Sequence, residues 1–355
     1  MTLVEFQQKL VPFFEQHGWI LSCCHKCNNS FFHKPSVAFT CNSVECISTV
    51  SIKGVKKKTV SYEELTSQMD DFFIRLGYKK RIFPNIKNPN KDTAFVVAAV
   101  QQYNYSLYNN HAIDDQYIYS PQPCIRLKEL SNFQLESGFL HSFINSATLK
   151  LNATFDDYCN YLDHWISFLS SVGIHASKLY IMISKTPAKI CDLYDGWNVD
   201  FLYNGLELGH CSYFHNVSQK YTGIDCGFCV ERILWVLNGG EFWSPLLPSD
   251  SSKICDKSHI SDDLLRTIVL IIMSNIVPGS KNDMYQLKKL LLSYKLSNQP
   301  WELIDYNFTH FYNFWRKYIP NAISLQESKG VFYSFLRKEY LLNEAASIDN
   351  LCPSR

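Results

Sequence analysis

Four cysteines near the start of the chain have the spacing of a metal site. Cys24 and Cys27 form a C-x2-C pair, and Cys41 and Cys46 form a C-x4-C pair after a gap of thirteen residues. Zinc is commonly held by two such pairs, because a tight turn aims two thiolates at one ion. We expect a structural zinc, since four protein ligands leave no open position for a substrate. A reduced, metal-free cluster is the alternative, and the rival ligands are Cys23, His25 and His33.

Three later segments carry residue types suited to nucleotide chemistry. Residues 122–127 (QPCIRL) include Arg126 and precede a strand that contains Phe143, residues 203–208 include Glu207, and residues 224–232 pass through glycine into a helix at Arg232. An ATP pocket needs one guanidinium on the α-phosphate, a second over the adenine and an aromatic ring on its opposite face. Taken alone, each residue has a structural alternative, an ordinary ion pair or core packing.

At these residues the chain resembles the class II aminoacyl-tRNA synthetases, and within them the alanyl family in its archaeal form. Residues 122–132 match a motif of the type QPCIRL-x-D-x-x-N, residues 205–208 match GLEL, and residues 224–235 match IDTGxGLERxxW. A cysteine knuckle precedes the catalytic domain in that form, and residues 262–294 are similar to the helical region that follows it. The resemblance covers residues 1 to about 295 in order and does not extend to the family's editing and C-terminal domains.

The resemblance implies a role for each matching residue. Arg126 would hold the α-phosphate and support the transition state of adenylate formation, Phe143 would stack on adenine, and Arg232 would cover its other face. The remaining implied contacts are Glu129 and Glu207 to ATP, Asp225, Asn198 and Gly227 to the amino acid, and Arg266, Lys288 and Lys289 to tRNA. The ligands implied are ATP, Mg²⁺ and a small amino acid, which is alanine with serine or glycine as alternatives.

The chain departs from the alanyl pattern at several positions of this site. Gly138 and Phe139 stand where the family has an arginine and a histidine near the ATP phosphates, and His141 is a candidate substitute. Cys226 and Cys229 replace a threonine and a glycine of the third motif. Losing one preorganised phosphate contact costs about a few kcal/mol of transition-state stabilisation, so activation could be slowed by orders of magnitude.

Three functions therefore remain open. The first is a ligase that forms an aminoacyl-adenylate and passes the amino acid to tRNA. In the second, the acceptor is a carrier protein or a small amine, because the arginine-rich stretch of the helical region is reduced here to two lysines. In the third, a catalytically impaired paralogue binds RNA or a protein partner through the old fold.

The elements that position these residues follow from apolar spacing. Helical spacing predicts helices over residues 3–17, 62–76 and 155–172, and again over 262–277, 282–296 and 301–318. Short apolar or β-branched runs predict strands between residues 82 and 127, including AFVVAAV and QYIYS, and at KLYIMIS. We predict an α+β fold, a class II synthetase-like antiparallel sheet flanked by helices, with domains at 1–58 (zinc knuckle), 59–244 (catalytic) and 245–355 (helical).

Composition excludes several other classes of protein. Hydrophobic residues make up 46% and charged residues 19%, a globular rather than a disordered balance. The net charge of +1 gives no overall basic field, and we expect no DNA partner. The start lacks the features of a secretory signal, and the longest apolar run is far short of the roughly 20 residues that cross a bilayer. We expect a cytoplasmic protein, off the membrane, whose thirteen cysteines are thiols or metal ligands.

Overall fold

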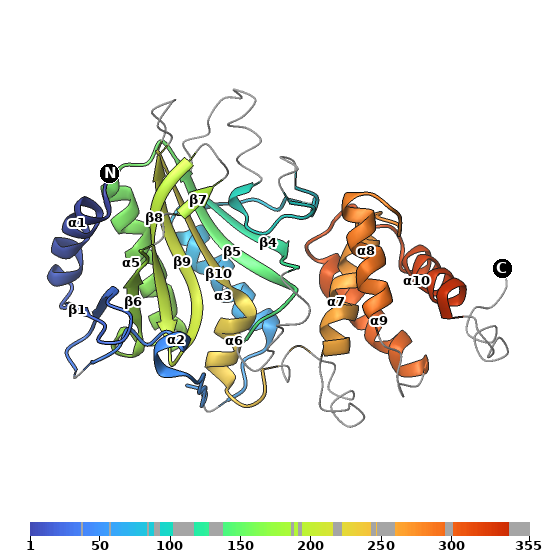
Figure 1. Ribbon diagram of the computed structural model, residues 1–355, viewed down its shortest axis with the longest axis horizontal. Coiled ribbons are helices and arrows are strands. Elements are labelled where there is room, and N and C mark those ends of the chain that lie inside the picture. The colour runs from blue at the N-terminus through green and yellow to red at the C-terminus, as the bar shows by residue number, and fades with distance from the viewer. Residues whose placement is uncertain are drawn as a thin grey trace. The chain divides into compact units, whose positions relative to one another are not determined.

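The structure is a computed structural model that describes residues 1–36, 38–56, 58–83, 85–88, 93–101, 117–127, 138–185, 188–190, 194–215, 222–242, 246, 260–294 and 301–340. The chain divides into two compact units, Met1–Phe83 with Asn88–Leu247 and Pro84–Lys87 with Pro248–Arg355. The first unit contains the sheet, and the described part of the second is helical (Figure 1). The domain limits expected from the sequence remain predictions.

One mostly antiparallel sheet forms the centre of the first unit. Its strands follow the order β1-β2-β6-β8-β9-β10-β5-β4-β3, and β7 pairs with β8. β3 pairs with β4 in parallel, whereas the neighbouring pairings are antiparallel. The strands are β1 (Ile20–Cys23), β2 (Ser30–His33), β3 (Lys79–Lys80), β4 (Ile118–Ile125), β5 (Ser142–Leu151), β6 (Tyr180–Ile183), β7 (Ala188–Ile190), β8 (Tyr194–Tyr203), β9 (Leu206–His215) and β10 (Thr222–Cys229). The predicted antiparallel sheet is confirmed.

The helices of this unit begin at the residues that the sequence indicates. Thr2, Ser61 and Thr154 each form a capping box with the acidic residue three positions later, which satisfies two backbone N–H groups at the helix start. The predicted helices over residues 3–17, 62–76 and 155–172 are therefore confirmed. The helical segments are α1 (Leu3–Gln16), α2 (Val44–Ile47), α3 (Tyr62–Arg75), α5 (Phe155–Val172), the 3-10 turn Ala176–Lys178 and α6 (Val230–Asn238).

Aromatic side chains pack the helices against one face of the sheet. The Trp165 ring of α5 stacks on Phe228 of β10 with centroids 3.9 Å apart, and its Nε1 donates to Thr148 Oγ1 at 2.8 Å. Phe73 of α3 lies 4.7 Å from Trp165, ring centroid to ring centroid. Because side chains alternate along a strand, the residues between these core positions point to the opposite face. That face carries Asp225 of β10, and beside it Leu149 and Ile118 pack under Ala99 and Val100 in an apolar cluster.

A tight hairpin joins β8 to β9 and carries Glu207. Asn204 and Gly205 form its two-residue loop with φ angles of 46° and 87°. Both positive angles are what a type I′ turn requires, and Asn-Gly is the sequence that adopts them most readily. Beyond this turn the pairing shifts, because Phe201 lies opposite Gly209 and Leu202 lies opposite Glu207. One residue of β9 is left over, which makes a β-bulge.

One predicted strand is wrong. The run AFVVAAV at residues 94–100 has a single bridge residue, Phe95, and otherwise forms bends and a turn that lead into helix at Val100. Ala99 and Val100 pack into a core cluster with residues of β4 and β5 instead of pairing as a strand. An apolar run this short fits either state, so tertiary packing decided it. The run nevertheless contributes to the site, because its carbonyls accept hydrogen bonds from the end of β4.

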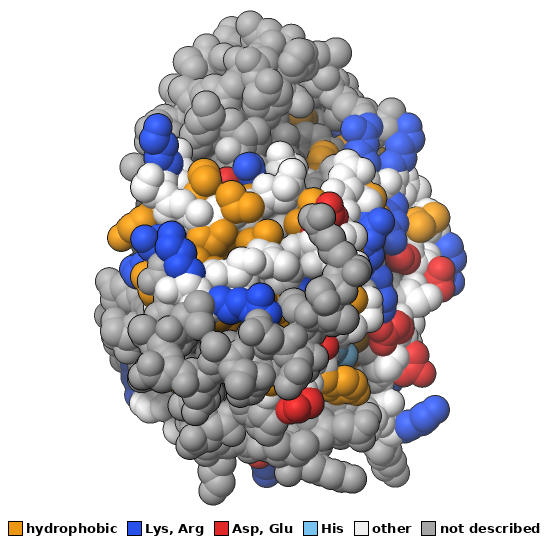
Figure 2. All heavy atoms as spheres, turned by 90° about the vertical axis from the view of Figure 1, so that its right-hand side faces the viewer, with side chains coloured by type: hydrophobic (Ala, Val, Ile, Leu, Met, Phe, Trp, Pro, Cys, Tyr) orange, Lys and Arg blue, Asp and Glu red, His pale blue; other side chains and the backbone are white. Residues whose placement is uncertain are grey.

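The described part of the second unit consists of four helices, and α7, α8 and α9 match predicted ones. They are α7 (Ile260–Met273), α8 (Asn282–Ser293), α9 (Trp301–Arg316) and α10 (Leu325–Tyr340), of which α10 lies beyond the predicted set. On the face of the molecule drawn in Figure 2, hydrophobic side chains form a band bordered by Lys and Arg. Within the described ranges, no helix is both long and apolar enough to span a membrane.

Candidate functional site

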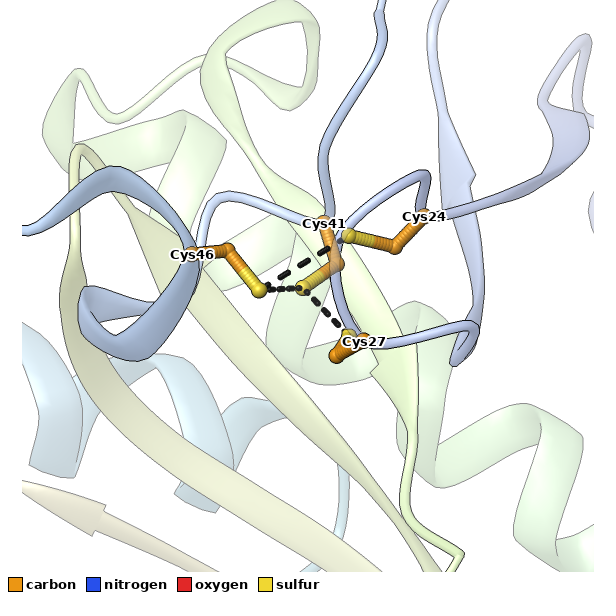
Figure 3. A group of neighbouring side chains, drawn as sticks. All are labelled: Cys24, Cys27, Cys41 and Cys46. Carbon is orange, nitrogen blue, oxygen red and sulfur yellow. Dashed lines mark hydrogen bonds between the residues drawn. The ribbon is translucent and has the colours of Figure 1, made fainter.

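The four predicted zinc ligands meet at one point (Figure 3). Their sulfur atoms all lie within 4.8 Å of one another, and three Sγ–Sγ distances, Cys24–Cys46, Cys27–Cys41 and Cys41–Cys46, are 3.7 Å. Tetrahedral zinc with Zn–S bonds of about 2.3 Å sets its ligands about 3.8 Å apart, so the four thiols fit that ion. Although burial acts to raise it, hydrogen bonds from backbone amides lower the pKa of Cys24 to about 6.

The rival ligands are turned to other partners. His33 shares a hydrogen bond with Ser22 Oγ through Nε2 at 2.9 Å and one with the Lys34 carbonyl through Nδ1 at 2.8 Å. His25 packs beside the Phe39 ring, and Cys23 is exposed. The ligand set expected from the paired spacing is thus the one that the fold brings together.

Arg126 and Arg232, which are far apart in the sequence, line the same cavity. Phe143, Glu207 and Gly227, which the sequence also singles out, line it with them. The cavity is open on one side and has a volume of about 40 Å³, so a nucleotide would need the side chains that line it to move aside. The other lining residues are Gly138, Phe139, Leu140, Asn145, Leu208, Gly209, His210 and Cys229.

The two guanidinium groups are held in different ways. The Arg126 guanidinium lies over the Phe143 ring, 5.0 Å from its centroid, and its Nε donates to the Val97 carbonyl at 3.1 Å. Arg232 is fixed by two carbonyls, because its Nε donates to Gly138 at 2.9 Å and its Nη1 donates to Glu207 at 2.8 Å. Arg232 is therefore preorganised, whereas Arg126 covers the ring on which adenine is expected to stack.

The β-bulge in β9 brings Glu207 and His210 together at the cavity. Residues three apart on a regular strand point to opposite faces, but here Glu207 Oε1 lies 3.6 Å from His210 Nδ1. Burial acts to raise the pKa of Glu207, yet His210 and Arg232 lower it to about 2. Burial likewise opposes the charge on His210, but Glu207 outweighs it and raises the pKa of the imidazole. Burial, reinforced by Glu207, raises the pKa of Asp200 to about 6.

The polar face of β10 carries the predicted amino-acid contacts. Asp225 is 4% exposed, and its Oδ1 has no hydrogen-bond partner among the described residues. Burial raises the pKa of Asp225 to about 6, against the opposing charges of His210 and Arg126. Gly227 follows on the same face, where a Cβ would lie 2.8 Å from the Asn145 amide nitrogen, so a larger residue would require the Asn145 side chain to shift. Asn198, on β8, donates from its amide to Asp200 at 2.9 Å.

Some predicted residues do not join this group. Glu129 falls outside the described residues. Arg266 is 1% exposed, and its guanidinium lies 5.0 Å from the Phe314 ring centroid and 4.6 Å from that of Trp315, both of α9, so it does not present its charge at the surface of this unit. Lys288 and Lys289 lie on α8, where Lys289 is exposed and Lys288 is half-buried. His141, the candidate substitute for the missing phosphate contacts, is buried and does not line the described cavity.

Sequence reasoning missed two residues that the fold makes important. His210 adds an imidazole to the cavity, and the bulge that turns it toward Glu207 has no signal in the sequence. Glu231, fully buried, accepts the Ile144 backbone N–H at 3.2 Å and so ties the start of α6 to β5. That tie fixes the next residue, Arg232. The acidic residue at the first turn of a helix was the available signal for Glu231.

The chain is similar in sequence to a known tRNA ligase. No family model matches the chain. Over 250 residues it is 22% identical to the alanine–tRNA ligase of Thermofilum pendens, an alignment that covers 64% of this chain and 27% of that ligase. The chain therefore spans little more than a quarter of that relative.

Similar solved structures are also tRNA synthetases. The pyrrolysyl enzyme of Desulfitobacterium hafniense is 16% identical with a TM-score of 0.38, covering 52% of this chain and 69% of its own. The seryl enzyme of Pyrococcus horikoshii, complexed with ATP, is 8% identical with a TM-score of 0.36. That match covers 54% of this chain and 56% of the seryl enzyme. The prolyl enzyme of Cryptosporidium parvum, complexed with L-proline and AMP, is 10% identical with a TM-score of 0.33. That match covers 50% of this chain and 44% of the prolyl enzyme. The sequence similarity of the chain is thus to an alanine–tRNA ligase, in an alignment that covers 64% of this chain.

Proposed function

We propose that this protein activates an amino acid with ATP and transfers it from the adenylate to tRNA. The observation that carries the proposal is the meeting of Arg126 and Arg232 at one cavity with Phe143 and Glu207. Two cations and an aromatic ring suit a bound nucleotide, and Glu207 offers a carboxylate to the Mg²⁺ that accompanies ATP. Alanine is the substrate that the similarity favours, with serine and glycine as alternatives.

In this scheme the residues of the chain position the substrates and neutralise charge, and none of them forms a covalent bond to a substrate. The carboxylate of the amino acid attacks the α-phosphate, and the bond to pyrophosphate breaks. Arg126 would swing from the Phe143 ring to the α-phosphate and stabilise its developing charge, which frees the ring for adenine. Arg232, already held by two carbonyls, would lie over the other adenine face. Asp225, buried without a partner for Oδ1, would accept the ammonium of the amino acid.

A zinc ion held by Cys24, Cys27, Cys41 and Cys46 completes the proposal. Such an ion supplies structural stability, because all four positions are filled by protein. The ligands join the turn between β1 and β2 to α2 and the segment that leads into it.

The test is amino-acid-dependent exchange of pyrophosphate into ATP, run with each of the common amino acids. Wild type should exchange with alanine, serine or glycine, and Arg126→Ala should lose about 100-fold or more, as for one preorganised contact on a transition-state oxyanion. Arg75→Ala is the matched control, because this exposed arginine lies on α3 and donates to the Asp71 carbonyl.

The outcomes separate the three functions. Exchange together with charging of tRNA supports the proposal. Exchange without tRNA charging would move the acceptor to a carrier protein or a small amine. Silence with every amino acid, in a folded protein, would refute activation and leave a paralogue that binds RNA or a protein partner.

A further inference from the structure

The linker between α2 and α3 concentrates positive charge away from the cavity. Lys53, Lys56, Lys57 and Lys58 fall within six residues, and no acidic residue occurs between Glu45 and Glu63. We call residues 53–56 together with Lys58 the lysine segment. Lys53, Lys56 and Lys58 are exposed, and none of them forms an ion pair with another described residue. An acid-free run of this kind attracts polyanions.

Backbone hydrogen bonds fix the lysine segment to the end of α6. Val55 N donates to the Val236 and Leu237 carbonyls at 3.1 Å, and Lys56 N donates to the Leu237 carbonyl at 2.9 Å. Farther on, Asn238 exchanges two hydrogen bonds with the Val60 backbone, at 2.8 and 2.9 Å. The side chains of Lys53, Lys56 and Lys58 thus extend from a backbone that is held in place, so binding through them costs less ordering entropy than binding through a free tail.

Two glycines allow this close approach. A Cβ on Gly54 would lie 2.6 Å from the Asn238 carbonyl oxygen, and one on Gly239 would lie 2.6 Å from the Gly54 nitrogen. Lys56 also passes the end of α5, where its Nζ would lie 3.1 Å from a Cβ built on Gly173. A cation at a helix C-terminus is favourable by itself, and one lysine is enough to interact with the helix dipole. The other lysines of the segment therefore call for another explanation.

We propose that the lysine segment is a docking surface for the phosphate backbone of RNA. Its anchor, Leu237, follows Arg232 by five residues of α6, which is roughly 8 Å along the helix axis. An RNA whose 3′ end reaches the cavity would have its backbone within reach of this surface. The inference rests on the proposed function only in taking RNA as the acceptor.

The experiment measures the binding of full-length protein to a short RNA hairpin with a single-stranded 3′ end, by fluorescence anisotropy at several salt concentrations. In the triple variant Lys53→Gln, Lys56→Gln, Lys58→Gln, the slope of log K against log salt should become shallower by about 2 to 3, since each lost phosphate contact removes about 0.7 to 0.9. The control triple carries the same charge change at exposed lysines elsewhere, Lys9→Gln, Lys79→Gln and Lys338→Gln.

Three results would overturn the inference: an unchanged slope in the lysine-segment triple, an equal change in the control triple, or equal displacement of the RNA by polyglutamate, which would indicate an acidic protein partner. Pyrophosphate exchange in the same variants separates this test from the proposed function, because the lysine segment does not line the cavity and exchange should persist. Exchange with no lysine-dependent RNA binding would defeat the inference alone, whereas lysine-dependent RNA binding without exchange in wild type would defeat only the activation chemistry.

Discussion

Replacing Asp225 by asparagine removes a buried charge while keeping the shape of the side chain. In the folded protein burial raises the pKa of this carboxyl from 3.8 to about 6, and the carboxyl is 4% exposed. Two pKa units correspond to about 3 kcal/mol of differential free energy between the two protonation states. At neutral pH the ionised Asp225 therefore destabilises the fold by about 3 kcal/mol, and the amide should restore most of it.

The sign and the pH range follow from linkage. Because the folded pKa lies above the unfolded one, the folded state holds its proton longer, and stability is lost as the pH rises from about 4 to about 6. The free energy of unfolding of Asp225→Asn should exceed that of wild type by about 3 kcal/mol at pH 8, and the difference should shrink steadily as the pH falls toward about 4.

Urea unfolding followed by circular dichroism at several pH values measures this difference, with the exposed Asp71→Asn as the control for a surface carboxylate. The same Asp225 variant should lose amino-acid-dependent exchange, because an amide cannot pair with an ammonium group. A variant that is less stable than wild type at pH 8, or a difference independent of pH, would refute the reasoning. Asp225 would then be a satisfied structural residue.

Four further outcomes are expected. Asp157→Asn should lower the free energy of unfolding by about 2 kcal/mol at pH 7. Burial acts to raise the pKa of Asp157, but Lys150 and the Thr154 cap hold it down to about 2. In urea titrations the loss should disappear as the pH falls from about 4 to about 2. Cys46→Ser should lose bound zinc in metal analysis and lower the melting temperature, whereas Cys23→Ser, outside the cluster, should retain the ion. Arg232→Lys should slow pyrophosphate exchange at least about tenfold, since one ammonium cannot reproduce the planar contacts to the Gly138 and Glu207 carbonyls, and wild-type exchange in this variant would contradict the role. Trp165→Leu should cost about 3 kcal/mol in chemical unfolding, because it loses the stack on Phe228 and leaves the Thr148 hydroxyl without its donor.

The sequence by itself determined the parts of this protein that depend on local spacing. Two short cysteine pairs predicted the ligand set that the fold assembles, because the turn between paired cysteines needs no distant contact. Capping residues and helical periodicity predicted the starts of α1, α3 and α5. The resemblance to the alanyl family implied that Arg126 and Arg232 would be neighbours, and the cavity that they line is consistent with that.

Tertiary structure decided the features that depend on which strands pair and where the register shifts. The run at residues 94–100 has strand composition but forms bends and a turn, and Ala99 and Val100 pack in the core against Ile118 of β4 and Leu149 of β5. Arg266 is a residue type that often binds phosphate, but here it is buried against the Phe314 and Trp315 rings. One extra residue in β9 places His210 beside Glu207, although strand alternation alone would separate them. A bulge arises from pairing with a partner strand, so a single segment of sequence carries no record of it.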